Sequence, residues 1–144
     1  DAFIGMDILC GFPGETKAHF ERGLAFLKRV EWTKLHVFPY SPRKGTPAAK
    51  FKDQLRREEI LRRAKTLRAL SGRRYASCLR STLGKPLLAL VEAGKSQRRG
   101  YDNALTRNYL PLLFQRRDEQ GLHNKEIVLK PYACDGQRLL ATMA

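Results

Sequence analysis

The segment Gly11-Phe12-Pro13-Gly14-Glu15-Thr16 is the first part of the chain whose residue types are suited to binding a ligand. Glycines at positions 11 and 14 have no Cβ, so the backbone there can approach a bound molecule closely. Thr16 is a suitable N-cap for a helix, and the free N–H groups at a helix start attract anionic groups. The same glycines would also serve a turn without a ligand, so the loop alone favours neither interpretation.

Cations and aromatic rings occur together between residues 98 and 109, which makes this stretch a second candidate site. RNA loops offer phosphates to cations and unstacked bases to aromatic faces. Tyr101 lies beside a glycine in a polar stretch, which favours a stacking role, whereas we predict that Tyr109 belongs to the core. The residues that make this combination are Arg98, Arg99, Tyr101, Arg107 and Tyr109.

The three cysteines and three histidines predict no metal site. Cys10, Cys78 and Cys134 lie more than fifty residues apart, which fits neither a disulfide framework nor a CxxC metal site. The first two fall on apolar stripes and are expected to be small core residues, and Cys134 is expected in a turn. None of the histidines has a serine, an acid or a metal ligand at a suggestive spacing.

A strand, a helix and a second strand are expected to position the first loop. Residues 3–10 form a nearly continuous apolar run bounded by Gly11 and Pro13, which predicts a strand buried on both faces. Apolar residues recur at helical steps after Thr16, and residues 35–40 alternate as a strand does. This order predicts a right-handed βαβ unit with parallel strands, whose carboxyl edge is the usual place for ligands.

Residues 53–82 contain no proline and predict one long amphipathic helix, or two helices that meet near Ser71-Gly72. Two i,i+4 ion pairs are expected, Glu58 with Arg62 and Glu59 with Arg63. The remaining polar face is basic and would lie along RNA phosphates, or it would be a surface helix that leads into the next domain. Its cations without an acidic partner at this spacing are Lys65, Arg68, Arg73, Arg74, Arg80 and Lys85.

Short apolar segments separated by turn residues follow Gly84. They predict a small antiparallel β-barrel, because closure of such a sheet removes its exposed edges. Pro111 and Pro131 are expected at strand ends or bulges. The expected strands are residues 86–91, 109–114, 126–132 and 138–142.

Composition favours a globular chain with a polyanionic partner. The 144 residues are 42% apolar, enough for one modest core or two small ones. The formal charge is +14, and residues 51–100 alone carry 14 basic and 4 acidic side chains. Such an excess favours nucleic acid, although a well-solvated surface is the alternative. No run of eighteen apolar residues and no signal peptide are visible, so we expect a cytoplasmic protein.

Two stretches resemble the later barrel strands of the radical-SAM methylthiotransferases, the MiaB, MtaB and RimO group. They are DILCGFPGET (residues 7–16) and LHVFPYSPRKGTPAA (residues 35–49), and the second is most like MtaB-type enzymes. The resemblance implies an α/β plus all-β fold. Residues 1–82, with the basic helix 53–82, would be the carboxy-terminal part of a radical-SAM (β/α) barrel. Residues 83–144 would be a TRAM-like domain, an OB-like antiparallel β-barrel that binds RNA.

The resemblance also implies the site residues. S-Adenosylmethionine would lie against the two strand ends, with Arg43 at the rim of the pocket, although the aromatic residues there are equally compatible with a core and Arg43 with a solvated loop. The cofactor-binding residues would be Leu9, Gly11, Phe12, Pro13, Gly14, Val37, Phe38 and Tyr40. The residues that contact substrate or RNA would be Arg43, Arg73, Arg74, Arg80, Arg98, Arg99, Tyr101 and Arg107.

The chain departs from the family pattern in two places. Family members hold [4Fe-4S] clusters through a CxxxCxxC triad and through cysteines of an amino-terminal domain, and neither set is present. The chain by itself is therefore expected to be inactive. In Thr106-Arg107-Asn108-Tyr109, Arg107 replaces the acid of the family's TDNY stretch, which weakens any role transferred to that segment and adds a cation.

The function implied is that of a fragment of a monomeric tRNA methylthiotransferase. The full enzyme would add a methylthio group to C2 of threonylcarbamoyl-adenosine, beside the anticodon of tRNA, by radical S-adenosylmethionine chemistry. Two alternatives stay open: a stand-alone basic RNA-binding module, and a radical-SAM enzyme that modifies a ribosomal protein. Residues 1–82 alone are expected to fold poorly, because a split barrel leaves open sheet edges.

Overall fold

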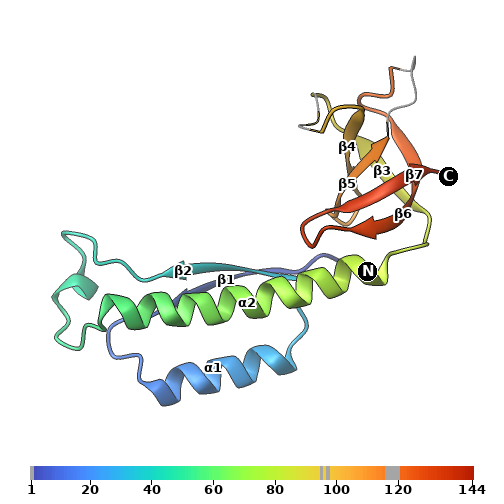
Figure 1. Ribbon diagram of the computed structural model, residues 1–144. Coiled ribbons are helices and arrows are strands. Elements are labelled where there is room, and N and C mark those ends of the chain that lie inside the picture. Colours follow the sequence, from blue (N-terminus) through green and yellow to red (C-terminus); the bar gives the residue numbers. More distant parts are fainter. Residues whose placement is uncertain (1, 95, 97, 116–120) are drawn as a thin grey trace. The chain divides into compact units, whose positions relative to one another are not determined.

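Figure 1 shows the computed structural model of the chain, which describes residues 2–94, 96, 98–115 and 121–144. The chain forms two compact units. One is Ile4–Arg73, and the other is built mainly of Arg74–Ala144. Within the described ranges, no helix has both the length and the apolar character that crossing a membrane requires.

The unit Ile4–Arg73 contains the predicted strand–helix–strand arrangement. Strand β1 (Gly5–Cys10) is followed by helix α1 (Lys17–Arg29) and by strand β2 (Lys34–Pro39). The strands pair in parallel, in register from Gly5 opposite Lys34 to Cys10 opposite Pro39. The prediction of two parallel strands joined by a helix is therefore confirmed.

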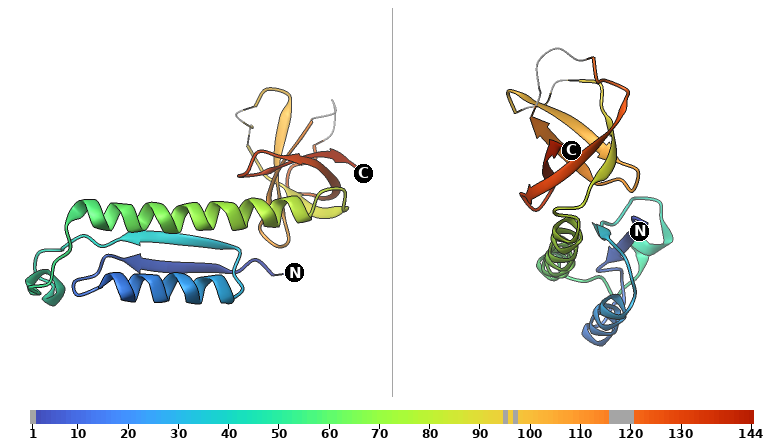
Figure 2. Two further views of the ribbon diagram at one scale, coloured as in Figure 1. Left: turned by 60° about the horizontal axis from the view of Figure 1, so that its bottom comes forward. Right: turned by 90° about the vertical axis from the view of Figure 1, so that its right-hand side faces the viewer.

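This two-stranded sheet is covered on one face only, so the prediction of a strand buried on both faces is wrong. Helix α1 and the first part of α2 (Arg57–Ser81) lie on the same side of it (Figure 2). Residues of a strand alternate between its two faces, and half of the apolar run of β1 therefore points away from the helices. The residues buried between the sheet and the helices are Cys10, Phe20, Leu27, Trp32, Leu35, Ala64 and Leu67.

Local hydrogen bonds fix both ends of α1. At its start, the Thr16 hydroxyl accepts a hydrogen bond from the His19 N–H, and the His19 side chain accepts one from the Thr16 N–H. A capping box of this kind satisfies backbone N–H groups that the helix itself leaves free. After its end, the buried Trp32 ring donates from Nε1 to the Leu27 carbonyl oxygen at 2.8 Å. The connection from α1 to β2 is therefore anchored in the core.

Helix α2 is one continuous helix of 25 residues, without a break at Ser71-Gly72. A glycine inside a helix costs about 1 kcal/mol relative to alanine, but tertiary contacts oppose a break here. The buried Ser71 hydroxyl accepts from the Leu35 N–H at 2.9 Å and so ties the helix to β2. The helix begins at Arg57, later than the expected residue 53, because a loop precedes it in which the Asp53 carbonyl accepts a hydrogen bond from the Gly14 N–H.

The second unit holds a closed barrel with the strand order β3-β4-β5-β7-β6. A small closed barrel was predicted, but its description as antiparallel is wrong for one pair, since β5 and β7 run parallel. Strand β4 was not predicted, because polar residues interrupt its apolar pattern. The strands are β3 (Leu87–Val91), β4 (Tyr101–Thr106), β5 (Pro111–Gln115), β6 (Glu126–Cys134) and β7 (Leu139–Met143).

The barrel interior is filled mainly by aliphatic side chains. Phe114 is completely buried, and Tyr75 and Leu79, near the end of α2, belong to the same core. Pro111 opens β5, and Pro131 lies at a register shift in β6, as predicted for prolines in sheets. The other residues of this core are Ala89, Val91, Ala104, Leu110, Leu112, Leu129, Leu139 and Ala141.

Candidate ligand-binding edge and nucleic-acid interface

The loop after β1 is a tight turn held by backbone hydrogen bonds. The Glu15 N–H donates to the Phe12 carbonyl at 2.9 Å, and Gly14 has φ of +82°. Proline followed by a residue with positive φ is the pattern of a type II turn, which favours glycine at the second position. The Gly14 N–H donates to Asp53 rather than facing solvent.

The conformation of Gly11 is explained by its contact with α2. Its φ is +76°, and a Cβ at this position would lie 2.7 Å from Cγ1 of Ile60. Its N–H donates to Oε2 of Glu15 at 2.6 Å. Since the His19 N–H is also used, by Thr16, two of the N–H groups that the sequence suggested for an anion have partners within the chain.

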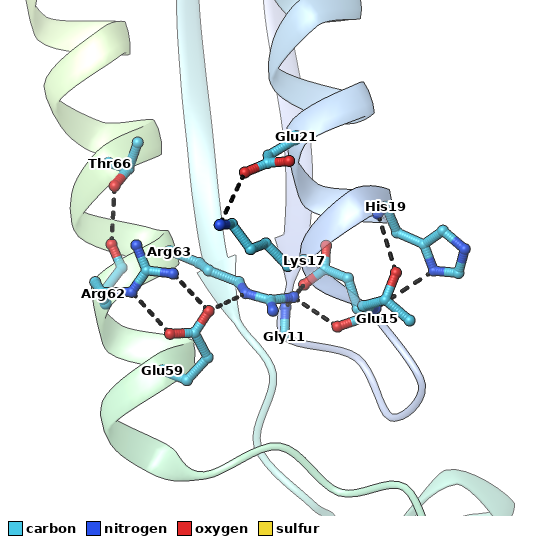
Figure 3. A network of polar contacts seen from close by, with 10 residues as sticks. Gly11, Glu15, Lys17, His19, Glu21, Glu59, Arg62, Arg63 and Thr66 are labelled. Atoms are coloured by element: carbon cyan, nitrogen blue, oxygen red, sulfur yellow. Dashed lines mark hydrogen bonds and ion pairs between the residues drawn. The ribbon is translucent and has the colours of Figure 1, made fainter.

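A buried arginine, Arg63, links this loop to α2 (Figure 3). Its Nη1 donates to both Oε2 and the backbone oxygen of Glu15, each at 2.7 Å, and its Nε donates to Glu59 at 2.7 Å. The guanidinium also lies 5.2 Å from the centre of the Phe20 ring. Only 5% of the Arg63 side chain is exposed. We call Glu15, Arg63 and Glu59 the Arg63 network.

The ion pairs on α2 differ in part from the predicted ones. Glu59 pairs with Arg63 as predicted, but Arg62 pairs with Glu59 rather than with Glu58. Hydrogen bonds from Arg62 and Arg63 lower the pKa of Glu59 from 4.5 to about 2. The Glu15–Arg63 contact joins residues 48 positions apart and was not predicted, since no local spacing signals it.

Apolar side chains are exposed at the carboxyl edge of the sheet, on the face away from the helices. Leu9 and Phe38 are cross-strand partners and are 53% and 52% exposed. Phe12 is also exposed, and its ring meets Tyr40 edge-on with 5.3 Å between the ring centres. This edge is where parallel sheets hold ligands, so these residues form the candidate ligand-binding edge.

The other predicted cofactor residues are placed differently. Val37 packs with the core on the helix-covered face, away from Phe38, and Pro13 is buried in the turn. The Tyr40 hydroxyl is buried without a hydrogen-bond partner in the described part of the chain. Buried polar atoms nearly always have a partner, which leaves this hydroxyl available to a bound group. Arg43 is exposed in a turn that Thr46 closes, and no ion pair of its side chain is found among the described residues.

An apolar pocket lies between β1 and α1 in the same unit. It is lined mainly by hydrophobic side chains from these two elements, and one of them, Phe26, is 57% exposed. Within the described sheet, β1 pairs with β2 alone, so its other edge has no neighbouring strand. The lining residues include Met6, Ile8, Leu24, Phe26 and Leu27.

The predicted RNA-contacting cations of α2 are not equivalent. Arg73 and Arg80 are exposed and are two turns apart on the helix, so they lie on one face. Arg74 is half-buried and interacts within the chain. Arg68 reaches back to donate to the Val37 carbonyl at 3.3 Å. The helix therefore offers fewer unengaged cations than its sequence indicates.

Strand β4 separates the barrel residues predicted to contact RNA. Arg98 lies over the ring of Tyr101 at 4.1 Å, and Arg99 beside it is exposed. Arg107 follows the opposite end of the same strand, where it forms a two-pronged ion pair with Glu126 at 2.9 and 2.8 Å. Arg98 and Arg99 therefore form a group with Tyr101 that does not include Arg107.

Tyr109 contradicts its prediction as a core residue. It is 69% exposed and has φ of +59°, in the left-handed region that non-glycine residues seldom adopt. The turn is built on Thr106, whose carbonyl accepts from the Tyr109 N–H and whose hydroxyl accepts from the Leu110 N–H. Leu110 takes the buried position that the sequence assigned to Tyr109.

The cysteines do not form a cluster site. Cys10 is buried on β1, and Cys78 packs against the barrel core, as predicted, while burial raises the pKa of both thiols. Cys134 ends β6 instead of lying in a turn. No group of three or more histidine, cysteine or acidic side chains suited to a metal ion occurs among the described residues. The thiolates that an iron–sulfur cluster needs do not converge in this chain.

Comparison with known proteins identifies a consistent set of relatives, although no protein-family profile matches the chain. The chain is 39% identical over 97 residues to tRNA-2-methylthio-N(6)-dimethylallyladenosine synthase 1 of Mycobacterium marinum, covering 67% of this chain and 18% of that protein. It is 35% identical over 120 residues to the synthase of Kineococcus radiotolerans, covering 77% and 24%. It is 39% identical over 92 residues to the synthase of Bacillus subtilis, covering 64% and 18%.

The chain thus spans about a fifth to a quarter of the length of these curated relatives. The matches cover about two thirds or more of the chain itself. The homologues of this chain are therefore tRNA-2-methylthio-N(6)-dimethylallyladenosine synthases, enzymes whose names place them among the methylthiotransferases that act on tRNA.

Proposed function

We propose that the full-length protein of which this chain is part is a tRNA methylthiotransferase that builds the 2-methylthio group of a modified adenosine. The observation that carries the proposal is the 35% identity over 120 residues to a synthase of that name. The parallel strands with an exposed apolar carboxyl edge support it, because such an edge suits an adenosine-containing ligand. Residues 1–82 would belong to the barrel that carries the chemistry, and residues 83–144 to a TRAM-like RNA-binding domain.

The names of the relatives favour dimethylallyladenosine as the modified base. They do not support threonylcarbamoyl-adenosine, which the sequence analysis predicted. That base remains the second candidate because the segment HVFPYSPRKGTPAA, residues 36–49, is most like MtaB-type enzymes. The two substrates differ only in the group on N6, so the choice between them is a matter of the pocket around that group.

The residues at the strand edge fit S-adenosylmethionine in their chemistry. Leu9, Phe12 and Phe38 offer an apolar and aromatic surface to the adenine, and the unpartnered Tyr40 hydroxyl offers a hydrogen bond. When bound, S-adenosylmethionine supplies the radical and the methyl group of this chemistry. The part of the protein described here would hold and orient the adenosyl group. The cysteines do not fit an iron–sulfur cluster, which would have to be held by residues outside this chain.

For tRNA, the exposed cations on the barrel and on α2 are the proposed contacts. Arg98 and Arg99 with Tyr101 combine charge with a ring face, which suits phosphates and unstacked bases. Arg73 and Arg80 add exposed charge on α2. Contacts of this kind position an anticodon stem-loop and weaken as salt rises, because phosphate binding releases counterions.

The test is to express the full-length protein in a bacterial strain that lacks its own methylthiotransferases and to analyse tRNA nucleosides by mass spectrometry. We expect 2-methylthio-dimethylallyladenosine to appear. Its threonylcarbamoyl counterpart would instead select the second substrate. If neither forms while the purified protein, with its clusters reconstituted, binds tRNA, the enzyme proposal fails and the RNA-binding module becomes the better account.

A further inference from the structure

We infer that Arg63 is a positioning residue, which holds the loop 11–15 so that Phe12 is presented at the carboxyl edge of β1 to the adenosine part of S-adenosylmethionine. The identity of the ligand rests on the function proposed above. The positioning itself rests on contacts within the unit Ile4–Arg73. Local spacing predicts only the ion pair of Arg63 with Glu59, and not its contact with Glu15.

The first step of the argument is that Arg63 binds two different parts of Glu15. One nitrogen, Nη1, donates to the carboxylate and to the backbone oxygen of Glu15, both at 2.7 Å. Two contacts on one residue fix its orientation as well as its position. A guanidinium is well suited to this because its donors are held in one rigid plane.

The second step is that Glu15 also binds the beginning of the loop, at Gly11. The oxygen that binds Arg63, Oε2, also accepts the Gly11 N–H at 2.6 Å. The Glu15 N–H closes the turn on the Phe12 carbonyl. Both ends of the loop are therefore tied to one buried cation, and Phe12 lies between them.

The third step is that α2 fixes the cation itself. Glu59, one turn earlier on the helix, binds Arg63 through Nε, and Ile60 fills the space that a side chain at Gly11 would need. The Phe20 ring covers the guanidinium from α1. One turn of α2 therefore fixes the position of the loop through Arg63 and, through Ile60, requires a glycine at position 11.

The burial of this charge suggests a role beyond stability. A buried ion pair seldom stabilises a fold more than well-packed apolar residues of the same size would, because desolvation offsets the attraction. Its distinctive effect is a fixed geometry. The geometry fixed here is that of Phe12, whose exposed ring has lateral support from Tyr40 and from Phe51, with 5.3 and 6.2 Å between ring centres.

The test uses the full-length protein with Arg63→Met, Arg63→Lys and the control Arg62→Met. Arg62 binds the same Glu59 but is 60% exposed, and no ion pair between it and Glu15 is found among the described residues. Two quantities are measured: hydrogen–deuterium exchange of the peptide that contains residues 10–16, in the protein without ligand, and the dissociation constant for S-adenosylmethionine by equilibrium dialysis. Exchange elsewhere in the protein reports general loss of structure.

We expect Arg63→Met to speed exchange in that peptide alone and to weaken S-adenosylmethionine binding at least about tenfold, the factor that corresponds to about 1.4 kcal/mol. Arg63→Lys should restore part of the affinity, and Arg62→Met should behave as wild type. Unchanged affinity of Arg63→Met, in a protein whose wild type binds the ligand, would overturn the inference and leave the proposed function intact. A wild type that binds no S-adenosylmethionine would overturn the ligand assignment and the proposed function together. If Arg63→Met does not fold, Glu15→Gln decides by the same two measurements.

Discussion

The β1–β2 sheet is open, whereas the sheet of the second unit closes on itself. The first has two strands, helices on one face, and Leu9 and Phe38 about half exposed on the other. The barrel has five strands in a closed order, and its interior residues Phe114, Leu129 and Leu139 are completely buried. Closure pairs the edge strands with each other, whereas the open two-stranded sheet, in the described part of the chain, leaves its outer edges unpaired and one of its faces uncovered.

The difference teaches where each unit obtains its stability. The barrel and the end of α2 together supply all the buried side chains of the barrel core. The β1–β2 sheet presents apolar surface that only other residues, or a ligand, can cover. A contiguous exposed apolar surface of this kind is typical of a surface that binds a ligand or packs against further chain.

The largest effect should appear when the two regions are separated. We expect residues 74–144 to unfold cooperatively on heating, because this fragment keeps the whole barrel core. We expect residues 1–82 to show no cooperative transition, because the apolar face and the strand edges of the β1–β2 sheet stay exposed to water. Circular dichroism and calorimetry of the two fragments measure this. A cooperative melt of residues 1–82 alone would show that the open sheet folds without further strands, and would contradict the proposed difference in stability between the two units.

The next effect sharpens the contrast within the barrel. Phe114→Ala in residues 74–144 should lower the free energy of unfolding by about 3–5 kcal/mol, because it leaves a cavity in a packed core. Val128→Ala, at a position that is 46% exposed on β6, is the control and should change it by no more than about 0.5 kcal/mol. Urea titrations give both values. Equal losses would mean that the barrel interior is not the source of its stability.

A smaller effect is expected in tRNA binding. Arg98→Ala should weaken binding of an anticodon stem-loop to the full-length protein and reduce the slope of log affinity against log salt by about 1, as for one lost phosphate contact. Arg107→Ala should change the slope less, because Glu126 already neutralises Arg107. Fluorescence anisotropy at several salt concentrations measures the slopes. A larger change in slope for Arg107→Ala than for Arg98→Ala would mean that the Arg107 end of β4, and not the Arg98 end, contacts the RNA phosphates.

The smallest effect concerns pH and the Arg63 network. The pKa of Glu59 is lowered from 4.5 to about 2, so its ionised form is favoured by folding. The stabilisation is complete above pH 4.5 and is lost as pH falls toward 2. The difference in urea midpoint between wild type and Glu59→Gln, measured in the full-length protein, should therefore shrink across this range. A difference that stays constant would indicate that the carboxylate charge contributes nothing.

Much of the fold followed from periodicity. The alternation of β2, the stripe of α1 and the long proline-free run of α2 all predicted their elements, with shifts of a few residues at the ends. The missed strand β4 has Asp102 and Thr106 at buried positions on either side of Ala104, so its inward face is not marked by a continuous apolar pattern. Its neighbour Tyr109 was misplaced for the related reason that the turn, not the alternation, decides which side chain points inward.

The candidate site was predictable only in outline. The glycines and aromatic residues near positions 11–14 and 38–40 lie at the carboxyl ends of β1 and β2, where the sequence predicted them. The contact of Arg63 with Glu15 spans 48 positions and has no local pattern, so it was invisible until the chain was folded. The predicted chemistry of Gly11 was also incomplete, since Ile60 occupies the space that a ligand was expected to use.

The sequence by itself determined the order of elements, the concentration of positive charge and the likeness to methylthiotransferases, because these depend on residue types and on spacing along the chain. Only the tertiary structure decided which face of β1 is open, which cations are engaged by carboxylates, and that the buried Arg63 contacts Glu15 in the loop after β1. These features depend on residues that are distant in sequence and meet only when helices pack on the sheet. Packing and charge pairing act between such residues, and no local pattern records them.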